Sequence, residues 1–248
     1  MKPAYTDPWN EDVNQEKSSM ETPKLTITDP GTGKNYVIPD IHGCFETFRA
    51  LLQKIDLQKD DHLFLLGDYM NRGPKSKEVI DLIIQLMNDG YRVYPLKGNH
   101  EDLAQTGYGL RKYNMTDTAG KPMERYIRFF KDLYYYIELE DTLLVHAGIN
   151  FETDNPYEDY ETMLWTKKNY RRVNPNPHKR IIHGHIVKPL DKIKAAIQNR
   201  EMWMPLDNGC YQKNRPQYGN LCCLELNAFQ LTLQENIDEM KDYQGKIL

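Results

Sequence analysis

The first part of the chain alternates between short apolar runs and longer amphipathic stretches. In residues 45–55 and 76–88, apolar side chains recur every three or four positions, which predicts two helices. Three apolar runs of strand length, 35–39, 62–66 and 91–96, lie around them. The order strand, helix, strand, helix, strand predicts an α/β fold, in which ligands bind at the carboxyl ends of the strands.

The rest of the chain is expected to contain mainly strands and loops. Residues 134–139 and 142–145 predict an antiparallel pair. Residues 150–180 are interrupted by prolines and are expected to be rich in loops. The aromatic residues of 107–132 indicate either a packed insertion or a lid over a site, and the packed insertion is the simpler interpretation. Further short strands are expected at 180–182, 202–206, 220–226 and 229–233.

The composition is that of an ordinary soluble protein. A chain of 248 residues with 40% hydrophobic and 27% charged residues fits one large domain. The net charge of −4 gives no support for sequence-independent binding of nucleic acid, and no apolar run is long enough to span a membrane. The N-terminal residues lack the apolar segment of a secretory signal. The four cysteines form no CxxC pattern, so we expect reduced thiols and a cytoplasmic location.

Both ends of the chain are polar. Residues 1–34 lack periodicity and are expected to form a flexible tail with one short strand at Leu25–Thr28. The folded domain is expected over residues 35–235. The charged residues 236–248 are expected to form a frayed C-terminal tail.

Polar clusters occur where apolar runs end. Their carboxylate, imidazole and amide groups form a ligand set for two hard or borderline cations. The five clusters are Asp40-Ile41-His42-Gly43, Gly67-Asp68-Tyr69-Met70-Asn71-Arg72-Gly73, Gly98-Asn99-His100-Glu101, His146-Ala147-Gly148 and His183-Gly184-His185. The expected metal ligands are Asp40, His42, Asp68, Asn99, His146 and His185.

This ligand set favours the metal-assisted hydrolysis of a phosphate ester. The carboxylate of Asp68 can bridge two cations, and a water held between them becomes a nucleophile near neutral pH. The neutral amide of Asn99 leaves net positive charge for an anionic substrate. The planar guanidinium of Arg72 suits a phosphate oxygen, and His100 can protonate a departing oxygen. Taken singly, each residue has an ordinary structural explanation, but the order of five clusters favours the site.

The motif order D-x-H-G, G-D-x-x-x-R-G, G-N-H-E, H-A-G, G-H resembles that of the calcineurin-like metallophosphoesterases. Within them it is similar to the phosphoprotein phosphatases, specifically their small bacterial and phage serine/threonine enzymes. The resemblance covers about residues 35–226 and extends to Leu206-Asp207-Asn208-Gly209-Cys210, which is similar to a D-x-G-C segment. It implies a β-sandwich flanked by helices in four αββα layers. It also implies two divalent metals (manganese, with iron or zinc as alternatives) and direct attack by a bridging hydroxide without a phosphoenzyme.

Three positions depart from the family pattern. Pro39 stands where a glycine usually precedes the first ligand, Asp40. Asn71 replaces an aspartate that in the family pairs with the histidine matching His100, so a weaker general acid is expected. Symmetrical diadenosine tetraphosphate hydrolases often lack that aspartate too. Lys167 follows Leu164-Trp165-Thr166, where the family has a second phosphate-binding arginine; Arg171 or Arg172 are possible substitutes.

The resemblance favours a serine/threonine protein phosphatase acting on a phosphorylated protein or peptide. The first alternative is a symmetrical diadenosine tetraphosphate hydrolase, and the second is a catalytically silent phosphopeptide-binding module. Neither nucleic acid nor membrane is expected as a partner, and the oligomeric state is open. Glu101 is expected to support its loop by hydrogen bonds. The expected catalytic residues are His100, Arg72 and Asn71, and the expected phosphate-binding residues are Arg72, Asn99 and Lys167.

Overall fold

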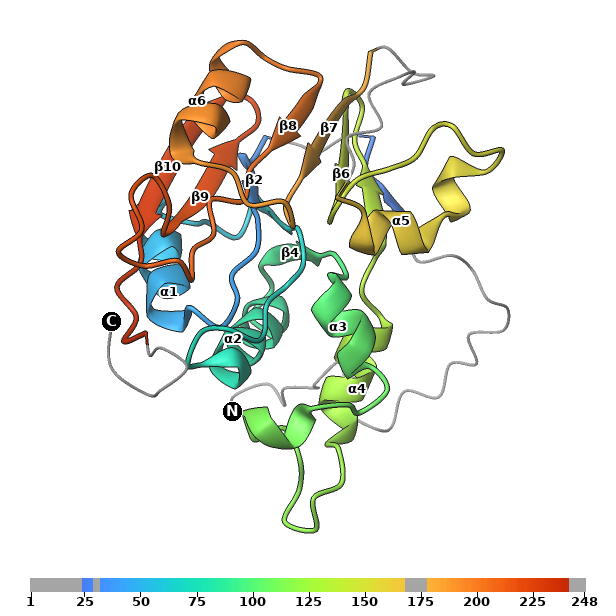
Figure 1. The fold of residues 1–248 in the computed structure, drawn as a ribbon, viewed down its shortest axis with the longest axis vertical. Helices are drawn as coiled ribbons and strands as arrows, with labels where there is room; N and C mark the ends of the chain where they lie inside the picture. The colour runs from blue at the N-terminus through green and yellow to red at the C-terminus, as the bar shows by residue number, and fades with distance from the viewer. Residues whose placement is uncertain (1–23, 29–31, 168–177, 241–248) are drawn as a thin grey trace, which may run out of the picture.

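The computed structural model describes residues 24–28, 32–167 and 178–240. These residues form two five-stranded sheets with helices on their outer faces (Figure 1). The first sheet has the order β10 (Gln230–Glu235), β9 (Asn220–Glu225), β2 (Asn35–Ile38), β3 (His62–Leu65), β4 (Arg92–Pro95). The second has the order β1 (Lys24–Thr26), β5 (Tyr136–Glu138), β6 (Thr142–Val145), β7 (Arg180–His183), β8 (Trp203–Pro205).

Each sheet contains three neighbouring parallel strands. In the first sheet β2, β3 and β4 run parallel, and in the second β6, β7 and β8 do so. The remaining contacts are antiparallel, apart from the parallel pair β1 and β5. The carboxyl ends of parallel strands lie at one edge of a sheet, so each sheet presents three strand ends together.

The alternation of side chains along the strands explains why the sheets stack. In β2, Val37 points into an apolar layer that also holds Leu144 of β6, whereas its neighbours Tyr36 and Ile38 belong to the layer under the helices. Strand β6 alternates likewise, since Leu143 packs in a third layer on the outer face of its own sheet. Both faces of each sheet are therefore buried, as the expected αββα architecture requires.

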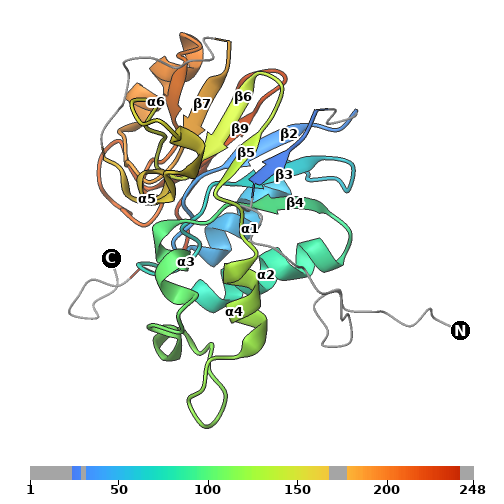
Figure 2. The same ribbon diagram turned by 90° about the vertical axis from the view of Figure 1, so that its right-hand side faces the viewer.

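The helices follow from amphipathic stretches that each bury one face. The outer face of the first sheet is covered by α1 (Phe45–Lys54), α2 (Ser76–Asn88) and α4 (Glu124–Lys131), which Figure 2 shows below the strands. Helix α5 (Tyr160–Trp165) packs Met163 on the opposite side of the molecule. Short helical segments complete the fold: α3 (Asn99–Ala104), η1 (Leu110–Tyr113) and η2 (Pro156–Glu158).

Most predicted elements are present within one or two residues of their expected bounds. Helix α6 (Leu190–Gln198) was not predicted, although Ile193, Ala196 and Ile197 form its buried face. Residues 150–167 contain η2 and α5 in addition to the expected loops, and residues 168–177 lie outside the described residues.

The insertion 107–132 is mainly packed rather than a free lid. Its residues Tyr126, Phe129 and Phe130 are buried in the layer beneath the first sheet, and only Tyr108 among its aromatic residues is widely exposed. This confirms the simpler interpretation of its aromatic content.

Residues 236–240, which follow β10, were expected to belong to a frayed tail but are packed against the rest of the fold. The carboxylate of Asp238 accepts hydrogen bonds from the backbone N–H groups of Glu46 and Thr47 at the start of α1, at 3.1 and 3.0 Å. These donors have no partner within the helix, so the acceptor from the distant segment satisfies them. Residues 1–23, expected to be part of the N-terminal tail, and 241–248 lie outside the described residues. None of the helices in the described part of the chain has the length and apolar character needed to cross a bilayer.

Candidate metal centre

The predicted ligands meet where the two sheets present the carboxyl ends of their parallel strands. In the first sheet, Asp40 and His42 follow β2, Asp68 follows β3, and Asn99 follows β4. In the second sheet, His146 follows β6 and His185 follows β7. Hydrogen bonds join the two halves, among them the one from the backbone N–H of His185 to Oδ1 of Asp40 at 2.9 Å.

Asp68 lies at the centre of this cluster. Its Oδ2 is 3.6 Å from Nε2 of His42, and its Oδ1 is 3.6 Å from Nε2 of His146. Two sets of donors share it: His42, Asp68 and His100 form one, and Asp68, His146 and His185 form the other, with the donor atoms of each set within 4.8 Å of one another. A carboxylate shared by two sets is the arrangement expected of a bridge between two cations.

The other two predicted ligands lie beside these sets. Oδ2 of Asp40 is 3.9 Å from Nε2 of His42. Oδ1 of Asn99 is 3.2 Å from Nε2 of His146. The structure therefore brings all six predicted ligands together.

The imidazoles are held by the nitrogen that faces away from the cluster. Nδ1 of His42 donates to the carbonyl of Met70 at 2.9 Å, and Nδ1 of His146 donates to that of Leu66 at 2.8 Å. This leaves the Nε2 lone pair of each ring directed at the carboxylates. Metal-binding histidines are commonly oriented in this way by a hydrogen bond from the other ring nitrogen.

Two buried polar atoms at the cluster have no partner among the described residues. They are Nε2 of His185 and Oδ2 of Asp207. Asp207 follows β8, is 1% exposed, and uses Oδ1 to accept from the backbone N–H of Gly209 at 2.7 Å. A buried polar atom without a partner is costly, so both atoms fit a site that binds cations. Asp207 was not among the predicted ligands; the only signal for it in the sequence is the D-x-G-C segment after an apolar run.

Burial controls the protonation of the histidines. It lowers the pKa of His42 to about 3 and the pKa values of His100 and His185 to about 4. It also lowers the pKa of His146 well below its usual range. These imidazoles are therefore neutral at pH 7, which is the form that binds metal.

The pKa values of the buried carboxylates shift upward, in the opposite direction. Burial raises the pKa of Asp40, and the nearby Asp207 and Asp68 raise it further. Burial also raises the pKa of Asp68, to which the charge of Glu101 adds, and it raises the pKa of Asp207 to about 6. Several buried carboxylates placed close together repel one another, and divalent cations between them would remove that cost.

Glycines allow the backbone to approach the carboxylates closely. A Cβ atom on Gly98 would lie 2.2 Å from Oδ1 of Asp68, and one on Gly184 would lie 2.1 Å from Oδ1 of Asp40. No larger residue fits at either position without displacing a ligand. The site residues with a left-handed backbone are His42, Asp68, Asn71, Arg72 and His185, with φ between 48° and 70°. Such strain is characteristic of functional sites.

Two further polar residues of the motifs are structural in this arrangement. The carboxylate of Glu101 accepts from the backbone N–H groups of Asp68, Tyr69 and Gly98 at 2.8, 2.9 and 3.1 Å, which confirms its expected support of the loop. His183 is buried and donates from Nδ1 to the carbonyl of Gly184 at 2.9 Å.

The residues expected to contact substrate lie around the metal-ligand cluster. Nε2 of His100 is 3.9 Å from Oδ2 of Asp68, and its Nδ1 is 3.2 Å from Nδ2 of Asn71. Arg72 and Lys167 are exposed at the edge, and the charges of both lower the pKa of His185, after the larger effect of burial. Positive charge from two separate segments of the chain therefore acts on the edge of the cluster. Arg171 and Arg172 lie outside the described residues.

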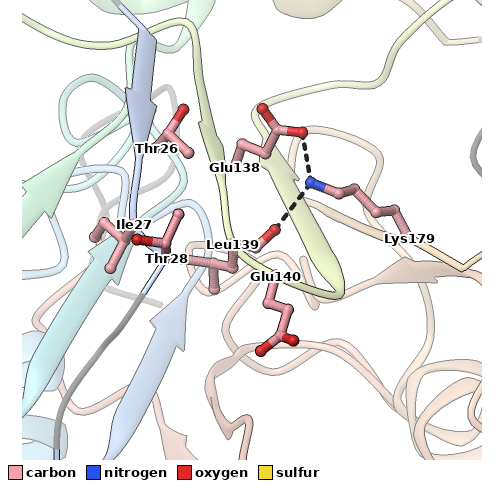
Figure 3. A pocket seen from close by; sticks show the side chains of 7 residues that line it. All are labelled: Thr26, Ile27, Thr28, Glu138, Leu139, Glu140 and Lys179. Carbon is pink, nitrogen blue, oxygen red and sulfur yellow. Dashed lines mark hydrogen bonds and ion pairs between the residues drawn. The ribbon is translucent and has the colours of Figure 1, made fainter.

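A hollow of about 420 Å³ lies elsewhere, between β1 and the turn that joins β5 to β6 (Figure 3). Lys179 points across it and donates to the carboxylate of Glu138 and the carbonyl of Leu139. This turn is at the opposite end of β6 from His146, so the hollow is separate from the metal-ligand cluster.

Comparison with known proteins identifies the family. The model of the calcineurin-like phosphoesterases matches residues 34–227, which is most of the chain and includes every residue of the cluster. The chain belongs to the calcineurin-like phosphoesterase family. Members of this family use a dinuclear metal centre, and the two donor sets that share Asp68 fit one.

Curated relatives include enzymes named as symmetrical bis(5'-nucleosyl)-tetraphosphatases. The enzyme of Nitrosococcus oceani is 36% identical over 124 residues, which are 46% of this chain and 43% of the relative. The enzyme of Hamiltonella defensa is 40% identical over 125 residues, 46% of this chain and 44% of the relative. The chain thus matches less than half the length of these two relatives.

Solved structures share the fold at low sequence identity. A serine/threonine phosphatase of Saccharomyces cerevisiae has a TM-score of 0.62 at 17% identity and covers 88% of this chain and 85% of its own. A protein-tyrosine phosphatase of a Shewanella species has a TM-score of 0.54 at 17% identity and covers 87% of this chain and 83% of its own. Proteins with different named substrates share this fold, so the fold alone does not select a substrate.

Proposed function

We propose that this chain hydrolyses dinucleoside tetraphosphates symmetrically, so that water cleaves the bond between the two central phosphates and releases two nucleoside diphosphates. Relatives at 36% and 40% identity are named for this activity. The chain matches less than half of their length, whereas the family match covers residues 34–227.

The observation that carries the proposal is the contact between Asn71 and His100. The backbone N–H of Arg72 donates to Oδ1 of Asn71 at 2.9 Å, which fixes the orientation of the amide. Its Nδ2 therefore faces Nδ1 of His100, at 3.2 Å, and donates to it. The ring then carries its proton on Nε2 and is stabilised in the neutral form, since no carboxylate accepts from Nδ1.

A neutral imidazole is a weak acid, and this affects the possible leaving groups. A serine or threonine alkoxide is strongly basic and must be protonated as it departs. A nucleoside diphosphate departs as a phosphate oxygen whose pKa is about 6, so it needs no strong acid. The pair formed by Asn71 and His100 is therefore better suited to cleaving a phosphoanhydride than an alkyl phosphate.

Three cationic side chains from separate segments suit a polyphosphate. The charges of Arg72 and Lys167 lower the pKa of His185, and those of Arg72 and of Lys112 in η1 lower the pKa of His100. In both cases burial has the larger effect. A single phosphomonoester carries two charges that Arg72 and two metals could neutralise. Additional cations near the cluster fit a longer anionic chain.

The roles of the chain's own residues follow from this geometry. Asp40, His42, Asp68, Asn99, His146 and His185 would hold the metals, which would supply Lewis-acid activation of the phosphate and of the attacking water. Arg72 orients the phosphoryl oxygens with its planar fork. His100 donates a hydrogen bond from Nε2 to an oxygen at the reacting centre, and Lys167 and Lys112 bind the outer phosphates.

The expectation of a protein phosphatase has weaker support. The yeast serine/threonine phosphatase supports the fold alone, at 17% identity. A catalytically silent module would have no need for His100 at the metal-ligand cluster.

Product analysis tests the proposal directly. The manganese-loaded protein is incubated with diadenosine tetraphosphate and the nucleotides are separated by chromatography. We expect ADP as the only product, with turnover lost on chelation and reduced by Arg72→Gln. Formation of AMP and ATP, or no cleavage by protein shown to bind manganese, would contradict the proposal.

A further inference from the structure

Tyr211 contacts both a predicted metal ligand and the predicted phosphate-binding arginine. It follows the D-x-G-C segment and is half-buried. Its ring centroid lies 5.1 Å from that of His42 with an interplanar angle of 86°. On the same ring, the guanidinium carbon of Arg72 lies 4.5 Å from the centroid. Tyr211 thus connects the cluster to the side chain that is expected to bind substrate.

This contact leaves the hydrogen-bonding groups of Arg72 available. An arginine that stacks on an aromatic face is attracted by the π system and uses no N–H donor to do so. Within the described part of the chain, the guanidinium of Arg72 has no carboxylate at ion-pair distance. Its fork is therefore held in place while its donors remain free for an anion.

The ring of Tyr211 is itself fixed by its surroundings. The side-chain amide of Gln212 donates to the Tyr211 hydroxyl at 3.2 Å, and the ring packs against the apolar layer beneath the first sheet. An arginine has four side-chain torsions to restrict, and a fixed platform reduces the entropy lost when the fork binds phosphate.

We propose that Tyr211 is a positioning residue that holds the guanidinium of Arg72 over the metal-ligand cluster so that it meets the phosphate of the substrate. This inference rests on the phosphoesterase function proposed above but not on the identity of the nucleoside. Neither the family motifs nor the predicted site include Tyr211.

The experiment compares three variants of the manganese-loaded full chain. Tyr211→Leu removes the aromatic face, Tyr211→Phe keeps it, and Phe229→Leu is a matched control. The guanidinium carbon of Arg200 lies 4.5 Å from the ring centroid of Phe229, which is the same kind of contact. Phe229 lies beyond the end of β9, next to the start of β2 and away from Asp40. The readouts are competitive inhibition by inorganic phosphate, kcat and KM on p-nitrophenyl phosphate, and manganese affinity by calorimetry.

We expect Tyr211→Leu to raise the inhibition constant of phosphate and KM together by about 3- to 30-fold, the range for loss of a cation–π contact. Manganese affinity should be unchanged, and kcat should fall less than kcat/KM. Tyr211→Phe should stay within about twofold of wild type, since the phenyl face is retained. Phe229→Leu should leave the phosphate constant unchanged. In an Arg72→Gln background, Tyr211→Leu should have no further effect on phosphate.

Other results would overturn the inference. They are an unchanged phosphate constant in Tyr211→Leu, an equal loss in Tyr211→Phe, weakened manganese binding, or an additive effect in the Arg72→Gln background. If the protein cleaves p-nitrophenyl phosphate but not diadenosine tetraphosphate, the proposed substrate is wrong while this test still applies. If neither is cleaved, calorimetric binding of phosphate by the manganese-loaded variants replaces the kinetic readout and has the same expected outcome.

Discussion

The backbone N–H of His185 donates to Oδ1 of Asp40 at 2.9 Å, and so links the first and last predicted ligands of the chain. Asp40 follows β2 of the first sheet, whereas His185 follows β7 of the second. The contact is possible because residue 184 is glycine, whose absent Cβ would lie 2.1 Å from the same oxygen. The geometry of the metal centre therefore depends on how the two sheets meet.

Gly184→Ala tests this dependence. The added methyl group must displace Asp40, so we expect manganese affinity to fall about 10- to 100-fold, as when the support of a ligand is lost. Isothermal titration calorimetry measures it. Gly90→Ala is the control, because a Cβ there meets nothing within 4 Å although φ is +83°. Unchanged manganese binding in Gly184→Ala would show that the close approach is not required.

Asn71→Asp tests how Asn71 controls His100. A carboxylate at position 71 accepts from Nδ1 and favours the imidazolium, so the pKa of His100 should rise and the residue should become a stronger acid. We expect faster hydrolysis of an alkyl phosphate by about tenfold, and little change on p-nitrophenyl phosphate, whose leaving group needs no acid. A rate on the alkyl phosphate that does not increase would contradict the role given to Asn71.

Asp207→Asn separates metal binding from folding. The variant keeps Oδ1, which accepts from Gly209, and replaces the unpartnered Oδ2 with an amide that carries no charge. We expect manganese affinity to fall about tenfold, while the metal-free protein is as stable as wild type or more stable because a buried charge is gone. Asp60→Asn, at an exposed position, controls for the change in net charge. If Asp207→Asn binds manganese as tightly as wild type does, Asp207 has no part in the centre.

The buried imidazole of His183 should make the free energy of unfolding depend on pH. Burial lowers its pKa to about 4, against 6.5 in an unfolded chain. Between these values the unfolded state binds more protons, so the contribution of His183 is present above pH 6.5 and is lost as the pH falls toward 4. Between pH 7 and pH 5 the loss is about 2 kcal/mol at 1.36 kcal/mol per pKa unit.

Urea unfolding with a chelator present measures this effect. His183→Gln should lose less free energy of unfolding than wild type between pH 7 and pH 5, by about 2 kcal/mol. Equal losses in both proteins would mean that His183 is not buried in its neutral form.

The sequence predicted most of the centre because its ligands follow apolar runs. Asp40, Asp68 and His146 each lie within three residues of the end of a strand, and parallel strands bring such positions to one edge. Asp207 also follows a strand, but one aspartate without a histidine nearby is a weak signal. The structure marks it as a candidate ligand, because its Oδ2 is buried without a partner among the described residues and its charge raises the pKa of Asp40.

Other features depend on contacts that no local pattern contains. The charged residues near Asp238 resemble a loose tail, yet the carboxylate of Asp238 meets the start of α1, far away in the sequence. Helix α6 has only a narrow apolar face, because Lys192 and Lys194 alternate with its buried residues. The edge-to-face contact between Tyr211 and His42 joins the loop before β9 to the loop after β2, and no local pattern in the sequence indicates it.

The most direct measurement compares kcat/KM of the manganese-loaded protein on diadenosine tetraphosphate and on a phosphothreonine peptide under the same conditions. The neutral His100 and the surrounding cations lead us to expect a value at least about tenfold higher for the dinucleotide, with two ADP formed per molecule cleaved. A higher value for the peptide would contradict the proposed function and would show that this centre expels an alkoxide despite Asn71.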